Sequence, residues 1–452
     1  MVLRRRLVGG ALAALLLGIL SCSDTTGPPA DLDLLDRLNA LPGVSAREIP
    51  PQYGYPRAFQ LDITQPLDHR APFGRTFTQR AYLSHTDESM PLVFGTSGYG
   101  ANEYTGSELA ALLQTNGLYV VHRFFPDARP SPMDWRYLNI RQAASDHHRI
   151  VQIFREIYPG PWVSTGASKG GMTALFHRRF FPDDVEATVA YVAPMMFSLE
   201  DERFVPFLAG LSTPEGRDAI HDFQQRLLTH SDSLLSRFEA WFPANGQTLN
   251  IPAGPAFESR VRGYEWNFWQ RHIYDYSQIP GPDEPYDRWI EHMAVVVRLH
   301  FTSDVNRDYF SAYQYQALTE LGGPAMDLSH LDGLYRFEPM DTREKYDLPE
   351  EIPEFSSEVT EDVVQWLETQ GDGIIYIYGG VDPWTGGAVQ PSPQTNALKF
   401  VQPGADHSVG IQDLDQRDLV LSTLGEWMGI QVAPVTSRSI TMHGLRAQLG
   451  IR

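Results

Sequence analysis

The fold of this chain is decided by the stretch at residues 162–176, which reads Trp162-Val163-Ser164-Thr165-Gly166-Ala167-Ser168-Lys169-Gly170-Gly171-Met172-Thr173-Ala174-Leu175-Phe176. Its centre, 166–170, is a Gly-x-Ser-x-Gly motif. A β-rich run precedes the motif, and a helical run follows it as far as Phe181-Pro182. A serine on a sharp strand-to-helix turn needs small residues two positions before and after it, because larger ones prevent the backbone from bending so tightly. We therefore predict that Ser168 is a nucleophile. The alternative is a structural glycine turn.

β-rich and helical segments alternate on both sides of this motif. The β-rich runs are 76–83, 91–94, 118–121, 187–193 and 373–378, and helical segments at 107–114 and 150–157 lie between the earlier ones. This alternation is typical of a mostly parallel sheet covered by helices on both faces. Together with the turn at Ser168, it predicts an α/β-hydrolase.

Helical, aromatic-rich sequence interrupts the alternation between residues 201 and 345. Helices are expected there at 222–238, 264–269, 289–300 and 309–321, with few strand signals between them. We predict that this segment is a cap inserted into the hydrolase core. The expected organisation is a signal peptide (1–22), a tether and N-terminal extension (23–55), the first part of the core (56–200), the cap (201–345), the second part of the core (346–430) and a C-terminal tail (431–452).

The first 22 residues have the features of a bacterial lipoprotein signal. Arg4-Arg5-Arg6 precedes a short apolar run, which ends at Ser21-Cys22. Cys22 is the only cysteine of the chain and lies where such signals place the lipidated residue; the alternative is a plain secretory signal. We expect an exported protein anchored to a membrane through Cys22, in the periplasm or at the cell surface. A single cysteine also excludes an intramolecular disulfide.

The 452 residues carry a formal net charge of −20, which makes nucleic acid an improbable partner. The histidines at 147, 148 and 177 lack the His-Glu-x-x-His spacing of a zinc site and lie on predicted helices, which favours a packing role. The chain also lacks a phosphate-binding loop and a dinucleotide fingerprint. We therefore expect no metal and no cofactor. The sequence does not indicate an oligomeric state.

A Ser–Asp–His order completes the expected site. Asp382 follows the β-rich run at 373–378, and His407 follows the short run at 398–401. In this fold the acid lies just past a late strand and the histidine on a loop after the next one. Asp372 and Asp406 are the competing acids, but Asp372 precedes its strand and Asp406 is adjacent to His407. The histidine would take the proton of Ser168, and Asp382 would orient the imidazole.

The oxyanion site should combine the backbone N–H of Lys169 with a second donor from the loop after an early strand. The loop Gly95-Thr96-Ser97-Gly98-Tyr99-Gly100 fits this position, with Gly98 and Tyr99 as the preferred region. An ordinary glycine turn is the alternative for this loop.

The sequence around Ser168 resembles the secreted tripeptidyl aminopeptidases of actinobacteria, which are distant relatives of lysosomal Pro-Xaa carboxypeptidases. Further similarity lies at 65–69 (Gln-Pro-Leu-Asp-His), 122–125 (His-Arg-Phe-Phe), 382–384 (Asp-Pro-Trp) and 315–322, where Ala317 replaces a cysteine of those relatives. The resemblance covers about residues 56–430. It implies a serine exopeptidase that removes tripeptides from free amino termini, often with proline near the cut. It also implies that Ser168, Asp382 and His407 are the triad.

An aminopeptidase needs a carboxylate that binds the substrate's ammonium group. Glu320 in the cap and Glu103 beside the oxyanion loop are the candidates, and a surface salt bridge is the alternative for each. Two other functions remain open at this point. A carboxylesterase or lipase would share the fold and triad, and a surface lipoprotein could bind peptides without cleaving them.

Overall fold

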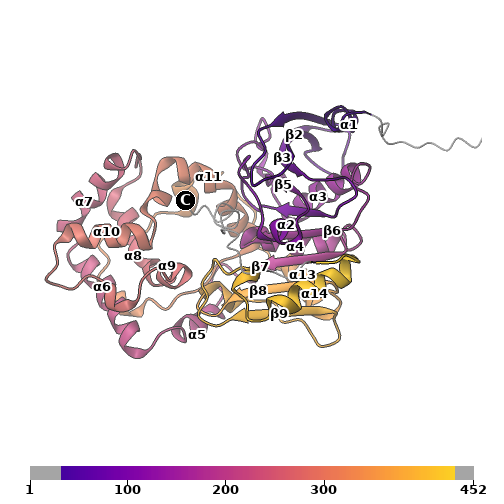
Figure 1. The fold of residues 1–452 in the computed structure, drawn as a ribbon. Coiled ribbons are helices and arrows are strands. Elements are labelled where there is room, and N and C mark those ends of the chain that lie inside the picture. The colour runs from indigo at the N-terminus through magenta and orange to yellow at the C-terminus, as the bar shows by residue number, and fades with distance from the viewer. Residues whose placement is uncertain (1–31, 433–452) are drawn as a thin grey trace, which may run out of the picture.

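The computed structural model describes residues 32–432 and contains one nine-stranded sheet in the order β1-β2-β3-β5-β4-β6-β7-β8-β9 (Figure 1). β1, β2, β3 and β5 pair antiparallel, and the pairs from β5 to β9 are parallel. The strands are β1 (Val44–Ile49), β2 (Arg57–Pro66), β3 (Thr76–His85), β4 (Leu92–Thr96), β5 (Asn116–Val120), β6 (Trp162–Ala167), β7 (Ala187–Tyr191), β8 (Ile374–Gly379) and β9 (Ala397–Gln402).

Helices cover both faces of the parallel part of the sheet. Residues of β4 to β8 are buried throughout, as expected for strands covered on both sides. Leu92 and Phe94 face one apolar core and Val93 faces another, as the two-residue period of a strand requires. The covering helices are α2 (Glu108–Leu113), α3 (Ile140–Phe154), α4 (Lys169–Phe180), α13 (Glu358–Thr369) and α14 (Arg417–Met428), whereas α1 (Leu34–Ala40) packs against β1 in the antiparallel part. These features confirm the predicted α/β-hydrolase class.

The chain between β7 and α13 forms a helical cap, seen in Figure 1 as a lobe beside the sheet. Its apolar side chains, among them Phe223, Phe257 and Trp289, belong to the same core cluster as Leu175 of α4 and Tyr376 of β8. The cap therefore shares one packed core with the hydrolase. Its helices are α5 (Phe204–Ala209), α6 (Pro214–Thr229), α7 (Ser231–Ala244), α8 (Ala253–Arg262), α9 (Tyr264–Arg271), α10 (Tyr286–Val296), α11 (Asp304–Gln316) and α12 (Thr342–Lys345).

Two cap segments differ from the helices that the sequence predicts. The segment 222–238 is divided at His230, where α6 ends and α7 begins. The break lets the two helices run in different directions while apolar residues of both pack into the same core cluster. The segment 309–321 leaves α-helical geometry after Gln316 and continues as a π-helical turn, Ala317–Leu321. Glu320 lies on this turn, so its direction could not be read from a 3.6-residue period.

The N-terminal extension also differs from expectation. Within the range 23–55, which the sequence separates from the core, α1 and β1 pack onto the hydrolase, and β1 adds an edge strand to the sheet. Only Val44 and Ile49 of β1 are buried, so its alternating pattern is too weak to predict a strand. The proposed signal peptide, Cys22 and most of the C-terminal tail lie outside the described residues. Within residues 32–432, none of the helices is both long and apolar enough to cross a membrane.

Candidate active site

Ser168 occupies a strained turn between β6 and α4. Its φ of 56° and ψ of −125° are rare for a residue with a side chain, and such strain concentrates at functional sites. Its N–H donates to the carbonyl of Tyr191 at 2.9 Å, which fixes the turn to β7. The flanking glycines are needed because a Cβ on Gly166 would contact the Gly170 carbonyl, and one on Gly170 would lie 2.7 Å from the Thr96 carbonyl.

Asp382 and His407 form a buried pair. His407 Nδ1 and Asp382 Oδ2 are 2.6 Å apart, and the two residues are 1% and 0% exposed. Burial raises the pKa of Asp382, and the interaction with His407 opposes that rise. The second imidazole nitrogen, His407 Nε2, is buried without a hydrogen-bond partner among residues 32–432. An imidazole held in this way by a carboxylate leaves Nε2 available to exchange a proton.

The order of the parallel strands brings this pair to the edge of the sheet that carries Ser168. β6, β7, β8 and β9 are adjacent and parallel, so the residues that follow them gather at one edge. The competing acids lie elsewhere or have other partners. Asp372 precedes β8 and accepts from the Asn396 N–H, and Asp406 accepts from the N–H and hydroxyl of Ser408.

The predicted oxyanion loop packs directly on the first turn of α4. Gly98 has a φ of 70°, and a Cβ there would lie 2.5 Å from Gly170 N and 2.6 Å from the carbonyl carbon of Lys169. Within residues 32–432, the backbone N–H groups of Tyr99 and Lys169 donate to no other group. Burial raises the pKa of the Tyr99 phenol well above its ordinary value, and the nearby side chain of Ser168 opposes that rise. The loop therefore presents free backbone donors beside the nucleophile.

The side chain of Lys169 reaches into the boundary between core and cap. Its Nζ donates to the Gly98 carbonyl at 2.6 Å and lies 5.3 Å from the ring centre of Phe125. Burial lowers the pKa of Lys169 to about 7, and the charge of Glu320 opposes that change. Burial likewise raises the pKa of Glu320 to about 7. Lys169 and Glu320 are therefore both buried, and the charge of each favours the charged form of the other, although no ion pair joins them among residues 32–432.

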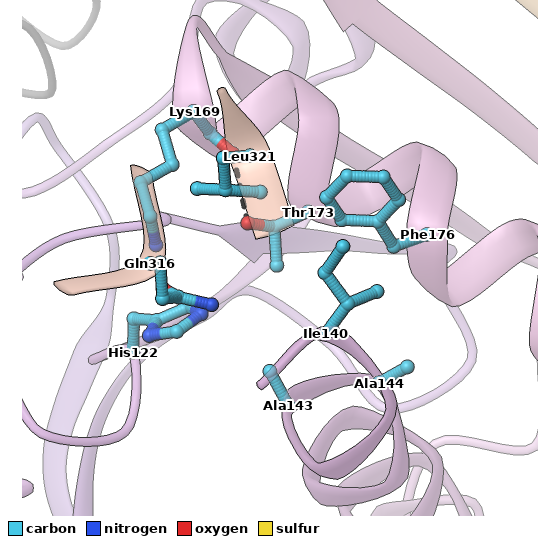
Figure 2. Close-up of a pocket in the computed structure, with 9 residues that line it drawn as sticks. All are labelled: His122, Ile140, Ala143, Ala144, Lys169, Thr173, Phe176, Gln316 and Leu321. Carbon is cyan, nitrogen blue, oxygen red and sulfur yellow. Dashed lines mark hydrogen bonds between the residues drawn. The ribbon is translucent and has the colours of Figure 1, made fainter. Parts of the chain in front are cut away.

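A cavity of about 10 Å³ lies beside Lys169, close to the minimum volume for a single water. Figure 2 shows its polar side chains on one side and its apolar ones on the other. The polar side is formed by Lys169, Gln316 and His122, and the apolar side includes Ile140, Ala143, Ala144 and Phe176. The cavity is too small for a peptide.

The two predicted ammonium-binding carboxylates lie in different environments. Glu320 is 9% exposed, and its Oε1 accepts from the Ile140 N–H at 2.7 Å and from Gln316 Nε2 at 3.2 Å. Glu103 is exposed on the loop after β4. The structure does not bring the two together, and a role for either in substrate binding stays a prediction.

Two positioning contacts could not be read from the sequence. The buried carboxylate of Glu108, on α2, accepts from the N–H groups of Ile411 and Gln412 at 2.8 and 2.9 Å, which fixes the loop after His407. The backbone N–H of His407 donates to the carbonyl of Gln270 at 3.1 Å. Gln270 is on α9, so the cap directly supports the histidine. Both contacts join residues more than 130 positions apart, and no local pattern signals them.

Two of the sequence motifs quoted above meet in a buried ion-pair network. Arg123 and Asp146 are both fully buried and are joined by two hydrogen bonds of 2.7 Å. His69 Nε2 is also 2.7 Å from Oδ1 of this carboxylate, the oxygen that accepts from Arg123 Nη2. The network fixes the 122–125 loop, whose Phe125 packs edge-on against Tyr99 at 5.5 Å. Through Phe125, the two motifs therefore hold Tyr99 of the oxyanion loop in place.

The fold and these contacts define an α/β-hydrolase with a serine turn, a buried Asp–His pair and a helical cap. Residues 27–447 match the family described as PS-10 peptidase S37. The chain is 33% identical over 434 residues to the prolyl tri/tetrapeptidyl aminopeptidase of Streptomyces mobaraensis, covering 92% of this chain and 91% of that protein. The chain belongs to the S37 peptidase family and is a serine peptidase.

The solved structure of proline iminopeptidase from Mycobacterium smegmatis is also similar. It shares 12% sequence identity and has a TM-score of 0.38, over 81% of this chain and 98% of that one.

Proposed function

We propose that this protein is a serine exopeptidase that releases tripeptides from free amino termini. The observation that carries the mechanism is the buried Asp382–His407 pair at the sheet edge that also carries the strained Ser168 turn. The specificity for tripeptides is supported by the printed activity of the Streptomyces relative and by the extent of the match to it.

The reaction follows an acyl-enzyme route. His407 Nε2 takes the proton of Ser168 as its hydroxyl attacks the scissile carbonyl, and Asp382 stabilises the imidazolium through Nδ1. The N–H groups of Lys169 and Tyr99 donate to the oxyanion that develops. The same Nε2 then protonates the departing amine, and water releases the peptide from Ser168. Glu320 and Glu103 are proposed to bind the substrate's ammonium group. Glu320 is favoured because it is buried and its charge acts on Lys169, the residue after Ser168.

We also propose that the protein is exported and held at a membrane by lipid on Cys22. The support is the sequence of residues 1–22, with its three arginines, apolar run and single cysteine. Extraction of the full chain from bacterial membranes, followed by intact mass measurement, tests this proposal. A lipid mass increment that Cys22→Ser abolishes would support it, whereas an unmodified Cys22 in the exported protein would contradict it.

The activity is tested with two chromogenic tripeptides ending in proline p-nitroanilide, one with a free amino terminus and one succinylated. We expect cleavage of the free form alone, lost in Ser168→Ala. Equal cleavage of both would contradict the exopeptidase proposal, and cleavage only of simple esters would indicate an esterase. Glu320→Gln and Glu103→Gln identify the ammonium site, because loss of that site should lower kcat/KM for the free form toward the rate of the succinylated one.

A further inference from the structure

Three cap arginines have no guanidinium nitrogen in a hydrogen bond or ion pair among residues 32–432, and each of them buries one such nitrogen. These atoms are Nε of Arg260 on α8, Nη1 of Arg271 at the end of α9, and Nη1 of Arg298 just after α10. Other cap arginines have carboxylate partners, such as Arg237 with Asp287 at 2.7 Å. The three residues are half-buried, so part of each remains accessible.

The position of Arg271 is fixed by the residue before it, Gln270, which contacts the His407 loop. The carbonyl of Gln270 accepts from the backbone N–H of His407, so the next residue lies against the histidine loop. Burial lowers the pKa of Arg271 to about 10, and the charge of Arg298 lowers it further. Asp406 and Asp382 oppose this change from a distance, since neither forms an ion pair with Arg271 in the described part of the chain.

Arg298 is connected to the oxyanion side of the site through aromatic rings. Its guanidinium lies 5.6 Å from the ring centre of Phe301, which packs edge-on against Phe310 at 5.3 Å. Phe310 in turn packs against Tyr99 at 5.9 Å. Arg298 itself has a φ of 49°, a strained value for a residue with a side chain. Gln270 thus places Arg271 on the His407 side of the site, and a chain of aromatic contacts runs from Arg298 to Tyr99 on the oxyanion side.

Among residues 32–432, no carboxylate forms an ion pair or a hydrogen bond with any of these three arginines. Burial lowers the pKa of His300, and Arg298, Arg260 and Arg271 all act in the same direction, so the four groups share one region of the cap. Unpaired charges of one sign are costly when they are buried together. A carboxylate relieves this cost and matches the planar donors of arginine with two parallel hydrogen bonds.

We propose that Arg271 and Arg298, with Arg260 and His300 adjoining, bind a carboxylate of the peptide substrate on the leaving-group side. This inference rests on the proposed peptidase function. His407 delivers a proton to the departing amine, so the departing segment lies beside the histidine loop, where Arg271 also lies. Either the C-terminal carboxylate of a short peptide or an acidic side chain in the departing segment provides this chemistry. The site therefore favours short or acidic peptides.

The test compares four tetrapeptides with free amino termini. They are Ala-Ala-Pro-Ala as the free acid, the same peptide as the C-terminal amide, and two amides ending in Glu or Gln. We expect kcat/KM for the free acid to exceed that for its amide about tenfold, the effect of one hydrogen-bonded ion pair. Arg271→Gln and Arg298→Gln should bring this ratio close to one. The ratio is internal to each variant, so partial loss of folded protein does not change it.

Arg262→Gln is the matched control, because Arg262 ends the same helix as Arg260 but lies over Tyr335, 5.8 Å from its ring centre. It should keep the wild-type ratio. A preference for the Glu amide over the Gln amide, without one for the free acid, would support the site and assign the carboxylate to a side chain. Equal rates within both pairs, with the chromogenic tripeptide still cleaved, would overturn this inference alone. Failure to cleave any of these substrates would overturn the proposed function as well.

Discussion

The carboxylate of Glu320 accepts a hydrogen bond from the backbone N–H of Ile140 at 2.7 Å. Ile140 is the first residue of α3, so its N–H has no acceptor within the helix, and the helix dipole favours a negative charge at this end. Glu320, from the helical cap, therefore provides the N-terminal acceptor for a helix of the hydrolase core that lies 180 positions away in sequence. This contact fixes the position of the π-helical turn relative to the sheet.

Glu320→Ala should lower the free energy of unfolding by about 1–2 kcal/mol, because it leaves the Ile140 N–H without its acceptor. Glu320→Gln should retain most of the stability, since the amide oxygen can accept the same bond. Urea unfolding at 25 °C measures both. Glu103→Ala is the control on an exposed site and should change little. Equal losses for Glu320→Ala and Glu103→Ala would contradict this account.

Gly98→Ala should reduce kcat about 10²- to 10³-fold, the loss expected when an oxyanion donor is displaced. A Cβ at Gly98 would lie 2.5 Å from Gly170 N, so the loop must move away from α4. Gly333→Ala is the matched control. Its φ of 77° is as unfavourable for alanine, but a Cβ there meets no atom within 4 Å. If both variants lose stability and neither loses kcat, the loop does not form the oxyanion site.

Asp382→Asn should lower kcat by about 10⁴-fold while the protein stays folded, because asparagine cannot stabilise the imidazolium and favours the wrong tautomer. Asp372→Asn is the control, since Asp372 precedes β8 and its side chain accepts from the Asn396 N–H. Kinetics on the free-amino tripeptide, with circular dichroism to verify folding, distinguish the two. A comparable loss in Asp372→Asn would contradict the assignment of Asp382.

Asp184→Asn should destabilise the protein in a pH-dependent way. Although burial opposes ionisation, hydrogen bonds with His148 and His177 hold the pKa of Asp184 at about 2. This pKa is below the unfolded value, so the stabilisation is present above about pH 4 and is lost as the pH falls through about 2. The difference from wild type should be about 2 kcal/mol at pH 6 and should shrink toward pH 2.

Urea unfolding at several pH values measures this difference, and Asp183→Asn is the neighbouring exposed control. The account is wrong if Asp184→Asn is equally destabilising at pH 6 and pH 2.

The site could be predicted from sequence only where its signals are local or follow chain order. The Ser168 turn is encoded within five residues, because the glycines that permit it are its own neighbours. Asp382 and His407 could be selected since each follows a recognisable strand, and the structure pairs them. The positioning roles of Glu108 and Gln270 could not be predicted, because both residues accept hydrogen bonds from a loop that is distant in sequence. The role of Glu320 at α3 was missed for the same reason.

The sequence by itself determined the parallel strands and the strand-to-helix turn at Ser168, since β-rich runs, glycine spacing and helix stops depend on near neighbours. It also determined that helices interrupt the core between β7 and β8. Only the tertiary structure decided that β1 joins the sheet, that α6 ends and α7 begins at His230, and that Gln270 of the cap accepts a hydrogen bond from the His407 N–H. These features arise from packing between distant segments, because burial and charge proximity are properties of the folded chain and not of any local stretch.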